Sequence, residues 1–184
     1  MREPVVLSGA RRSERGFTLI ELGVVIAILG VLAALVIPNW AQTARNRKYD
    51  PEISAMFTEM STREEQYKSE IGNGAYLDEA QCPTSPTPNG SDFNATCVTT
   101  GSTWATLRVV PTDSAIRCTY QVETGLPSAV PAPPAPCILP VNTVAGSWYY
   151  MIATCDMDGD GAPYSTFCMA SWNTTVQKSS NYGQ

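Results

Sequence analysis

Three aspartates in the last part of the chain are the side chains best suited to bind a metal ion. Asp156, Asp158 and Asp160, followed by Gly161, match positions 1, 3, 5 and 6 of an EF-hand calcium loop. Position 12 is Phe167, where that loop has a bidentate glutamate, so only half of the pattern is present. Calcium would offset the repulsion between three neighbouring carboxylates. The alternative is a hairpin turn, in which Gly adopts the backbone conformation of the turn and the Asp side chains accept hydrogen bonds from its backbone.

A second candidate is a single carboxylate inside a long apolar segment. The segment runs from Phe17 to Ile37, 21 residues, and its only other interruptions are Thr18, Gly23 and Gly30. As a helix it would be about 31 Å long, close to the ~30 Å hydrocarbon core of a bilayer. A carboxylate in such a helix is costly and needs a partner. No Lys or Arg of the segment supplies one, so Glu21 predicts an interaction with a group elsewhere.

The composition argues against catalysis and against nucleic-acid binding. The chain has no histidine, which excludes Ser-His and Cys-His nucleophiles and His-containing zinc sites. The net charge is −5, and loss of residues 1–16, with four basic and two acidic side chains, makes it −7. An acidic chain has little affinity for nucleic acid. We therefore expect a protein that is not an enzyme, with no catalytic residue and no cofactor other than calcium.

Six cysteines follow the apolar segment and predict a disulfide framework in an oxidising compartment. No C-x-x-C pair is present, which argues against zinc. The position of Cys155 and Cys168 on either side of the acidic loop predicts one bridge between them. By proximity in the sequence we expect the others to be Cys82–Cys97 and Cys118–Cys137, although six cysteines allow 15 pairings.

The elements that must position these residues follow from periodicity and turn signals. Residues 1–16 form a basic leader, residues 17–44 a hydrophobic helix, and residues 45–184 a head domain. Gly30 and Pro38 weaken the hydrophobic helix and bound a stretch able to bend or melt locally. Asp50-Pro51 indicates a kink or a new helix start. In the head, the patterns predict an amphipathic helix at 51–71 ended by Gly72-Asn73-Gly74, a surface loop at 78–103, and a sheet over about 105–173 with strands at 106–110, 115–123, 147–154 and 166–172.

The junction between the leader and the apolar segment is the most specific motif. Gly16-Phe17-Thr18-Leu19-Ile20-Glu21, with basic residues before it and the apolar run after it, resembles the class III signal of type IV pilins and of type II secretion pseudopilins. The resemblance implies that a prepilin peptidase cleaves between Gly16 and Phe17 and methylates the new amine of Phe17. It also implies that Glu21 faces such an amine during assembly, and that the helix between Gly30 and Pro38 loosens in the filament.

The same resemblance implies a fold and a function. The fold would be α+β, a pilin-like roll in which a long N-terminal helix packs on a four-stranded antiparallel sheet with disulfide bonds. The chain would be an inner-membrane precursor that an assembly platform polymerises with other pilin subunits into a surface pilus for adhesion or motility. Two alternatives stay open: a type II secretion pseudopilin, and a membrane-anchored adhesin that binds through the loop at 78–103.

Overall fold

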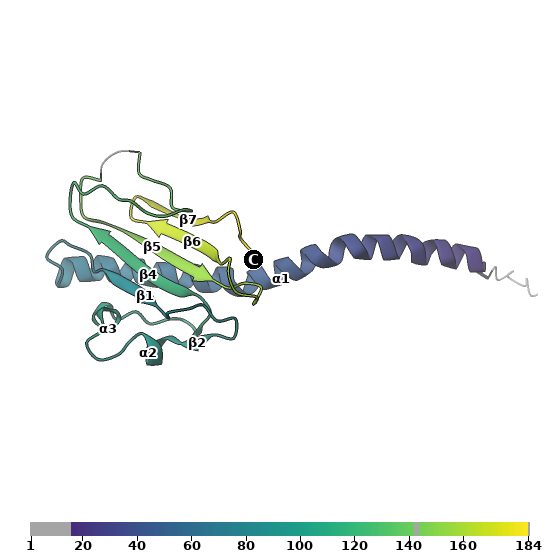
Figure 1. Cartoon of the computed structure of the whole chain (residues 1–184), viewed down its shortest axis with the longest axis horizontal. Coiled ribbons are helices and arrows are strands. Elements are labelled where there is room, and N and C mark those ends of the chain that lie inside the picture. The colour runs from purple at the N-terminus through teal and green to yellow at the C-terminus, as the bar shows by residue number, and fades with distance from the viewer. Residues whose placement is uncertain (1–15, 142–143, 184) are drawn as a thin grey trace, which may run out of the picture. The chain divides into compact units, whose positions relative to one another are not determined.

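A computed structural model describes residues 16–141 and 144–183 of the chain, so the predicted leader, apart from Gly16, lies outside the described residues. The chain divides into two compact units between Trp40 and Ala41. We call residues 41–183 the head unit. The elements, labelled in Figure 1 except for β3, are α1 (Leu19–Glu70), β1 (Glu79–Cys82), β2 (Ser91–Asp92), α2 (Phe93–Thr96), α3 (Thr103–Leu107), β3 (Ala115–Ile116), β4 (Thr119–Gly125), β5 (Trp148–Cys155), β6 (Ser165–Ala170) and β7 (Asn173–Lys178).

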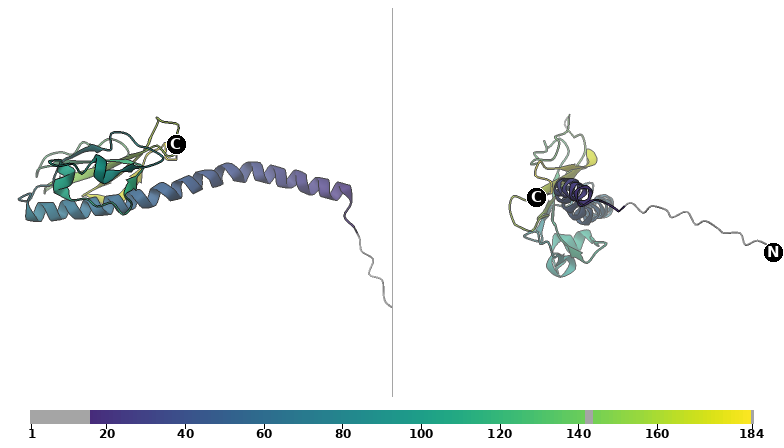
Figure 2. Two further views of the ribbon diagram at one scale, coloured as in Figure 1. Left: turned by 90° about the horizontal axis from the view of Figure 1, so that it is seen from below. Right: turned by 90° about the vertical axis from the view of Figure 1, so that its right-hand side faces the viewer.

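The part of α1 that belongs to the head unit supplies one side of the core. Its buried apolar side chains recur at helical spacing and form one stripe: Tyr49, Ile53, Met56, Phe57 and Met60. Figure 2 shows this part of α1 alongside the sheet. Burial of each large apolar side chain contributes roughly 1.5–3 kcal/mol, which exceeds what helix propensity alone provides. The helix continues through Asp50-Pro51, so a new helix start at that point was a wrong alternative.

The glycine-rich end of α1 follows the predicted stop signal. The helix ends at Glu70, and the Gly72 N–H donates to the Tyr67 carbonyl at 2.7 Å. Asn73 and Gly74 then have φ values of 49° and 89°, a left-handed conformation that Asn and Gly tolerate better than other residues. The chain can therefore reverse and run back toward the sheet.

Five antiparallel strands form the main sheet, in the order β1-β4-β5-β6-β7. The α+β class with antiparallel sheet and disulfides agrees with the pilin-like fold, but the expected count of four strands is wrong. The sequence pattern gave no strand at β1 or β7, which are edge strands with few buried side chains. The inner face of the central strands meets α1, and Phe57 packs edge-on against Tyr120 at a ring separation of 6.3 Å.

The predicted hairpin of strands 106–110 and 115–123 is also wrong. Residues 103–107 form helix α3, because Ser102 caps it by accepting from the Ala105 N–H at 3.1 Å, and Trp104 and Leu107 are buried three residues apart. Only Ala115–Ile116 and Thr119–Gly125 are strands, β3 and β4.

The loop predicted at 78–103 is more structured than a surface loop. It contains β1, β2 and α2, and Phe93 is fully buried against Trp104 with ring centroids 5.3 Å apart. Asp92 caps α2 by accepting from the Ala95 N–H at 3.1 Å. Tertiary contacts with Trp104, which lies outside the predicted loop, therefore order this segment.

A proline-rich segment, described over residues 126–141 and 144–147, lies over the outer face of the sheet. Trp148, Tyr150 and Ile152 of β5 are buried there. The indole N–H of Trp148 donates to the Ala129 carbonyl at 2.9 Å, and that of Trp172 donates to the Ile138 carbonyl at 3.0 Å. This cover has no strand of its own among the described residues, as expected for a proline-rich connection.

Candidate functional site

The junction at Gly16 and Phe17 leads directly into the start of α1. Phe17 is 89% exposed, and Thr18 precedes the first helical residue, Leu19. The Glu21 carboxylate accepts from the Thr18 N–H at 2.8 Å and from the Thr18 hydroxyl at 2.9 Å, while the Glu21 N–H donates to that hydroxyl at 3.3 Å. This is a capping box, which satisfies donors at the helix N-terminus and gives the carboxylate local partners.

The expected partner of Glu21, the amine of Phe17, does not exist in the uncleaved chain, where that nitrogen is part of a peptide bond. The pairing of the amine with the carboxylate therefore stays a prediction. The capping role of Thr18 was missed in the sequence, although the spacing Thr-x-x-Glu before an apolar run is its recognised signal.

The side chains of the apolar stretch Leu19–Val36 of α1 are all exposed. Leu19–Val36 has a mean hydropathy of 2.8 and is the one helix in the described part of the chain long and apolar enough to cross a membrane. Side chains on all sides of it are exposed, including Ile26 at 60% and Leu29 at 58%. A helix that is apolar all round requires a bilayer or other protein surface to cover it. Loosening between Gly30 and Pro38 stays a prediction.

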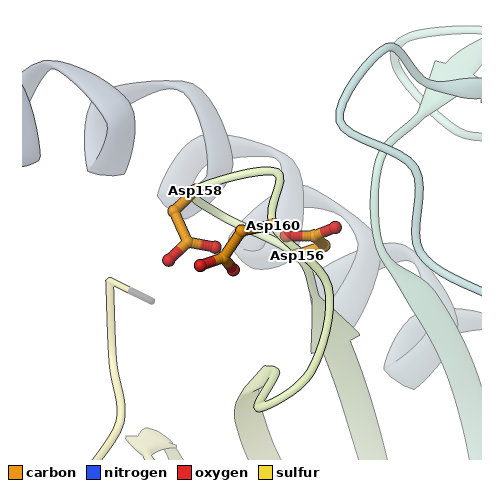
Figure 3. Close-up of side chains that lie close together, drawn as sticks. All are labelled: Asp156, Asp158 and Asp160. Carbon is orange, nitrogen blue, oxygen red and sulfur yellow. The ribbon is translucent and has the colours of Figure 1, made fainter.

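The acidic loop follows β5 and brings the three predicted carboxylates together (Figure 3). One oxygen from each of Asp156, Asp158 and Asp160 lies within 4.8 Å of the others. Asp156 is buried and accepts from the Gly159 N–H at 2.8 Å, while its own carbonyl accepts from the Tyr49 hydroxyl at 2.9 Å. The hydrogen bond from Tyr49 thus attaches the loop to α1. The bond from the Gly159 N–H agrees with a hairpin turn, and the cluster of carboxylate oxygens agrees with a calcium site.

The negative charges of the three aspartates in this loop repel one another. A hydrogen bond to Asp158 and the charge of that neighbour raise the pKa of Asp160. In addition, Oδ1 of Asp158 is buried without a hydrogen-bond partner among the described residues. These features allow either a shared proton or a cation, so the expectation of calcium at Asp156, Asp158 and Asp160 stays a prediction.

The cysteines form three disulfides, of which Cys82–Cys97 was predicted. The other predicted pairs, Cys155–Cys168 and Cys118–Cys137, are wrong, because the bridges are Cys118–Cys155 and Cys137–Cys168. The sheet explains the error.

Alternating side chains of a strand point to opposite faces. Cys155 lies in the inner core with Cys118, beside the register pair Thr119 and Thr154. Cys168 is paired with Ile152, whose side chain belongs to the outer cluster. It is therefore on the face that the proline-rich cover approaches with Cys137.

Three buried glutamates of the head unit were not singled out in the sequence. The carboxylate of Glu52 accepts from the Arg117 N–H at 2.7 Å, the Cys118 N–H at 3.1 Å and the Tyr120 hydroxyl at 3.2 Å, and pairs with the Arg117 guanidinium at 3.1 Å. The other two, Glu64 and Glu79, are 0% and 1% exposed. Glutamates are normally exposed, whether on an amphipathic helix or on an edge strand, so no local signal identifies these positions.

Comparison with known proteins gives matches over parts of the chain. Residues 11–37 match the family model of the prokaryotic N-terminal methylation motif. The type IV wide pilus major component PilA4 of Thermus thermophilus is 43% identical over 65 residues, 35% of this chain and 47% of that protein. These matches show similarity to the type IV pilin and pseudopilin superfamily over part of the chain.

Two further members of the superfamily match over shorter segments. The type IV major pilin protein PilA of Myxococcus xanthus is 47% identical over 47 residues, 24% of this chain and 21% of that protein. The type II secretion system core protein G of Klebsiella michiganensis is 66% identical over 29 residues, 16% of this chain and 20% of that protein. The matches thus cover less than half the length of these relatives, and no solved structure matches the chain. The relatives' names describe filament and secretion components rather than enzymes.

Proposed function

We propose that this chain is a structural subunit of a type IV pilus. The observation that carries the proposal is the apolar part of α1, which starts directly after the Gly16–Phe17 junction and leaves its side chains exposed. In the precursor a bilayer covers this helix, and in the filament the same helices of other subunits cover it. The disulfide-bonded head unit, which has its own core, remains outside the membrane.

The processing step follows from the same junction. We propose that a prepilin peptidase cleaves between Gly16 and Phe17 and methylates Phe17, before an assembly platform in the inner membrane adds the subunit to the filament. Cleavage frees the nitrogen of Phe17 as an amine, which is cationic. An amine and the Glu21 carboxylate compensate each other's desolvation in a dry helix bundle better than either group does alone.

The test is N-terminal analysis and intact mass of the protein sheared from cell surfaces. We expect an N-methylated Phe17 at the start and a mass six hydrogens below that of the reduced chain, as three disulfides require. Gly16→Ser should retain the leader, and Glu21→Val should leave membrane insertion intact but prevent filaments. Leu22→Ile is the matched control and should assemble normally. Recovery of the chain only from the inner membrane, with Met1 retained, would contradict the proposal and favour an anchored binding module.

A second candidate is a subunit of a type II secretion pseudopilus. The observation that favours it is the match to core protein G, which is 66% identical over 29 residues, against 43% over 65 residues for PilA4. The 65-residue match to a pilus component is longer than the apolar segment and favours the pilus. Deletion of the gene separates the two: loss of surface filaments with normal enzyme export supports the pilus, and loss of enzyme export supports the pseudopilus.

A further inference from the structure

Two of the buried carboxyls lie where the chain leaves α1 and returns to the sheet. Oε2 of Glu64, on α1, accepts from the Leu77 N–H at 2.9 Å. Oε2 of Glu79, on β1, accepts from the Thr103 hydroxyl at the start of α3. Together these hydrogen bonds attach the segment 76–79 to α1 on one side and to α3 on the other.

Neither carboxyl has the partners that an ionised group needs. The Oε1 atoms of both Glu64 and Glu79 are buried without a hydrogen-bond partner among the described residues. The ion pairs found in the described part of the chain involve other carboxylates, such as Glu52, which has a guanidinium and three further donors. A buried ionised carboxylate without such compensation is costly, and its protonated form costs much less.

The groups that face the two carboxyls make ionisation still less favourable. Glu65 of α1, Tyr76 and Asp78 of the segment after α1, and Tyr149 of β5 interact electrostatically with Glu64 or Glu79. Lys68 of α1 contacts Tyr76. The one cation among these groups, Lys68, is directed at Tyr76, with its Nζ 2.9 Å from the phenol oxygen. Tyr76 in turn donates to Glu65 at 2.7 Å. The set therefore has an excess of acidic groups.

We propose that Glu64 and Glu79 form a pH-sensitive latch, which holds residues 76–79 and the start of α3 in place while both carboxyls are protonated and loosens as they ionise. This role is independent of the pilus proposal, since it concerns the head unit alone. The Cys82–Cys97 bridge does not replace the latch, because both of its cysteines lie between Glu79 and Thr103 and neither is on α1. β1 still pairs with β4, so the expected opening is local.

The direction of the pH effect follows from proton linkage. Burial raises the pKa of Glu64 from 4.5 to about 8, aided by the charge of Glu79. Burial likewise raises the pKa of Glu79 to about 7, aided by Asp78. A carboxyl with a raised pKa in the closed state stabilises that state fully below its ordinary pKa, and this stabilisation is lost as the pH rises through the raised value. Between these limits the opening constant rises up to about tenfold per pH unit for each carboxyl.

Hydrogen–deuterium exchange of the full-length chain in detergent micelles, from pH 5 to pH 9, tests the latch. After correction for the intrinsic pH dependence of exchange, protection of the Leu77 amide and of the first turn of α3 should fall by at least tenfold. Glu64→Gln should keep the Leu77 amide protected across the range, because Gln retains the acceptor and cannot ionise. Glu79→Gln should do the same for the start of α3. Glu70→Gln, an exposed position on the same helix, is the matched control and should behave as the wild type.

The proposal would be overturned if protection of these amides in the wild type does not change between pH 5 and pH 9. It would also be overturned if the double variant, Glu64→Gln with Glu79→Gln, loses protection as steeply as the wild type. Exchange in β5 and β6 provides an internal reference, because a variant that fails to fold loses protection there as well. If a variant fails to fold, the proposal is tested on the wild type instead, by ¹³C NMR titration of the Glu64 and Glu79 carboxyls. Titration midpoints near pH 4.5 for both carboxyls would refute the latch.

Discussion

Replacement of Glu52 by alanine removes the acceptor that joins α1 to the beginning of β4. Glu52 lies on α1 with a side chain that is 4% exposed, and its partner Arg117 is 22% exposed. The alanine side chain would leave the Arg117 guanidinium without its counter-ion, and it would leave the buried N–H of Cys118 without its acceptor. Both losses affect the folded head unit and leave the unfolded chain nearly unchanged.

The expected magnitude follows from that geometry. Breaking a buried ion pair by removing one partner costs about 3–5 kcal/mol, and we expect the lower end because water reaches Arg117 in part. The unfolding free energy of the head unit should therefore fall by about 3 kcal/mol, a decrease in Tm of roughly 6–12 °C for a domain of this size. The matched control is Glu59→Ala on the same helix. The side chains of Glu59 and its ion-pair partner Arg63 are 28% and 30% exposed, so the loss of unfolding free energy should be about 0.3–0.5 kcal/mol.

Urea and thermal unfolding at pH 7, followed by near-ultraviolet circular dichroism in micelles, measure both variants. A double-mutant cycle with Arg117→Met separates the coupling from the loss of each side chain, and we expect at least 1 kcal/mol of coupling. The argument that burial makes the Glu52–Arg117 pair important would be refuted if Glu52→Ala lowers the unfolding free energy by less than 1 kcal/mol. It would also be refuted if Glu52→Ala and Glu59→Ala lower it equally.

Three further predictions concern the sheet and the loop. Replacing both Cys137 and Cys168 by serine should expose residues 126–147 to proteolysis before the rest of the head unit, and resistance equal to the wild type would show that the two Trp hydrogen bonds suffice. Gly125→Ala should cost about 1–3 kcal/mol of stability, because its Cβ would lie 2.1 Å from the Trp148 ring; an unchanged urea midpoint would show that the ring moves freely. Millimolar calcium should raise the Tm of the wild type and not that of Asp158→Asn if the acidic loop binds this ion, and equal shifts in both would leave only the turn interpretation.

Several features of the protein were fixed by local sequence. The apolar run after Phe17 and the Gly16–Glu21 junction are contiguous motifs, whose meaning does not depend on contacts with distant residues. The amphipathic helix was predicted because its apolar side chains recur with the helical period, and its end because Gly72-Asn73-Gly74 favours left-handed backbone. The apolar helix, long enough to cross a membrane, and the α+β class were therefore predictable, while the role of Glu21 in assembly stays a prediction.

Tertiary structure decided the pairing of the cysteines and the roles of the buried acids. Proximity in sequence predicted Cys155–Cys168, but the alternation of side chains placed these two on opposite faces of the sheet, and register placed Cys155 beside Cys118. Helix α3 replaced an expected strand because Trp104 found a buried partner in Phe93. The burial of Glu52, Glu64 and Glu79 depends on which segments cover the carboxylates after folding, and neighbouring residues in the sequence do not encode that arrangement.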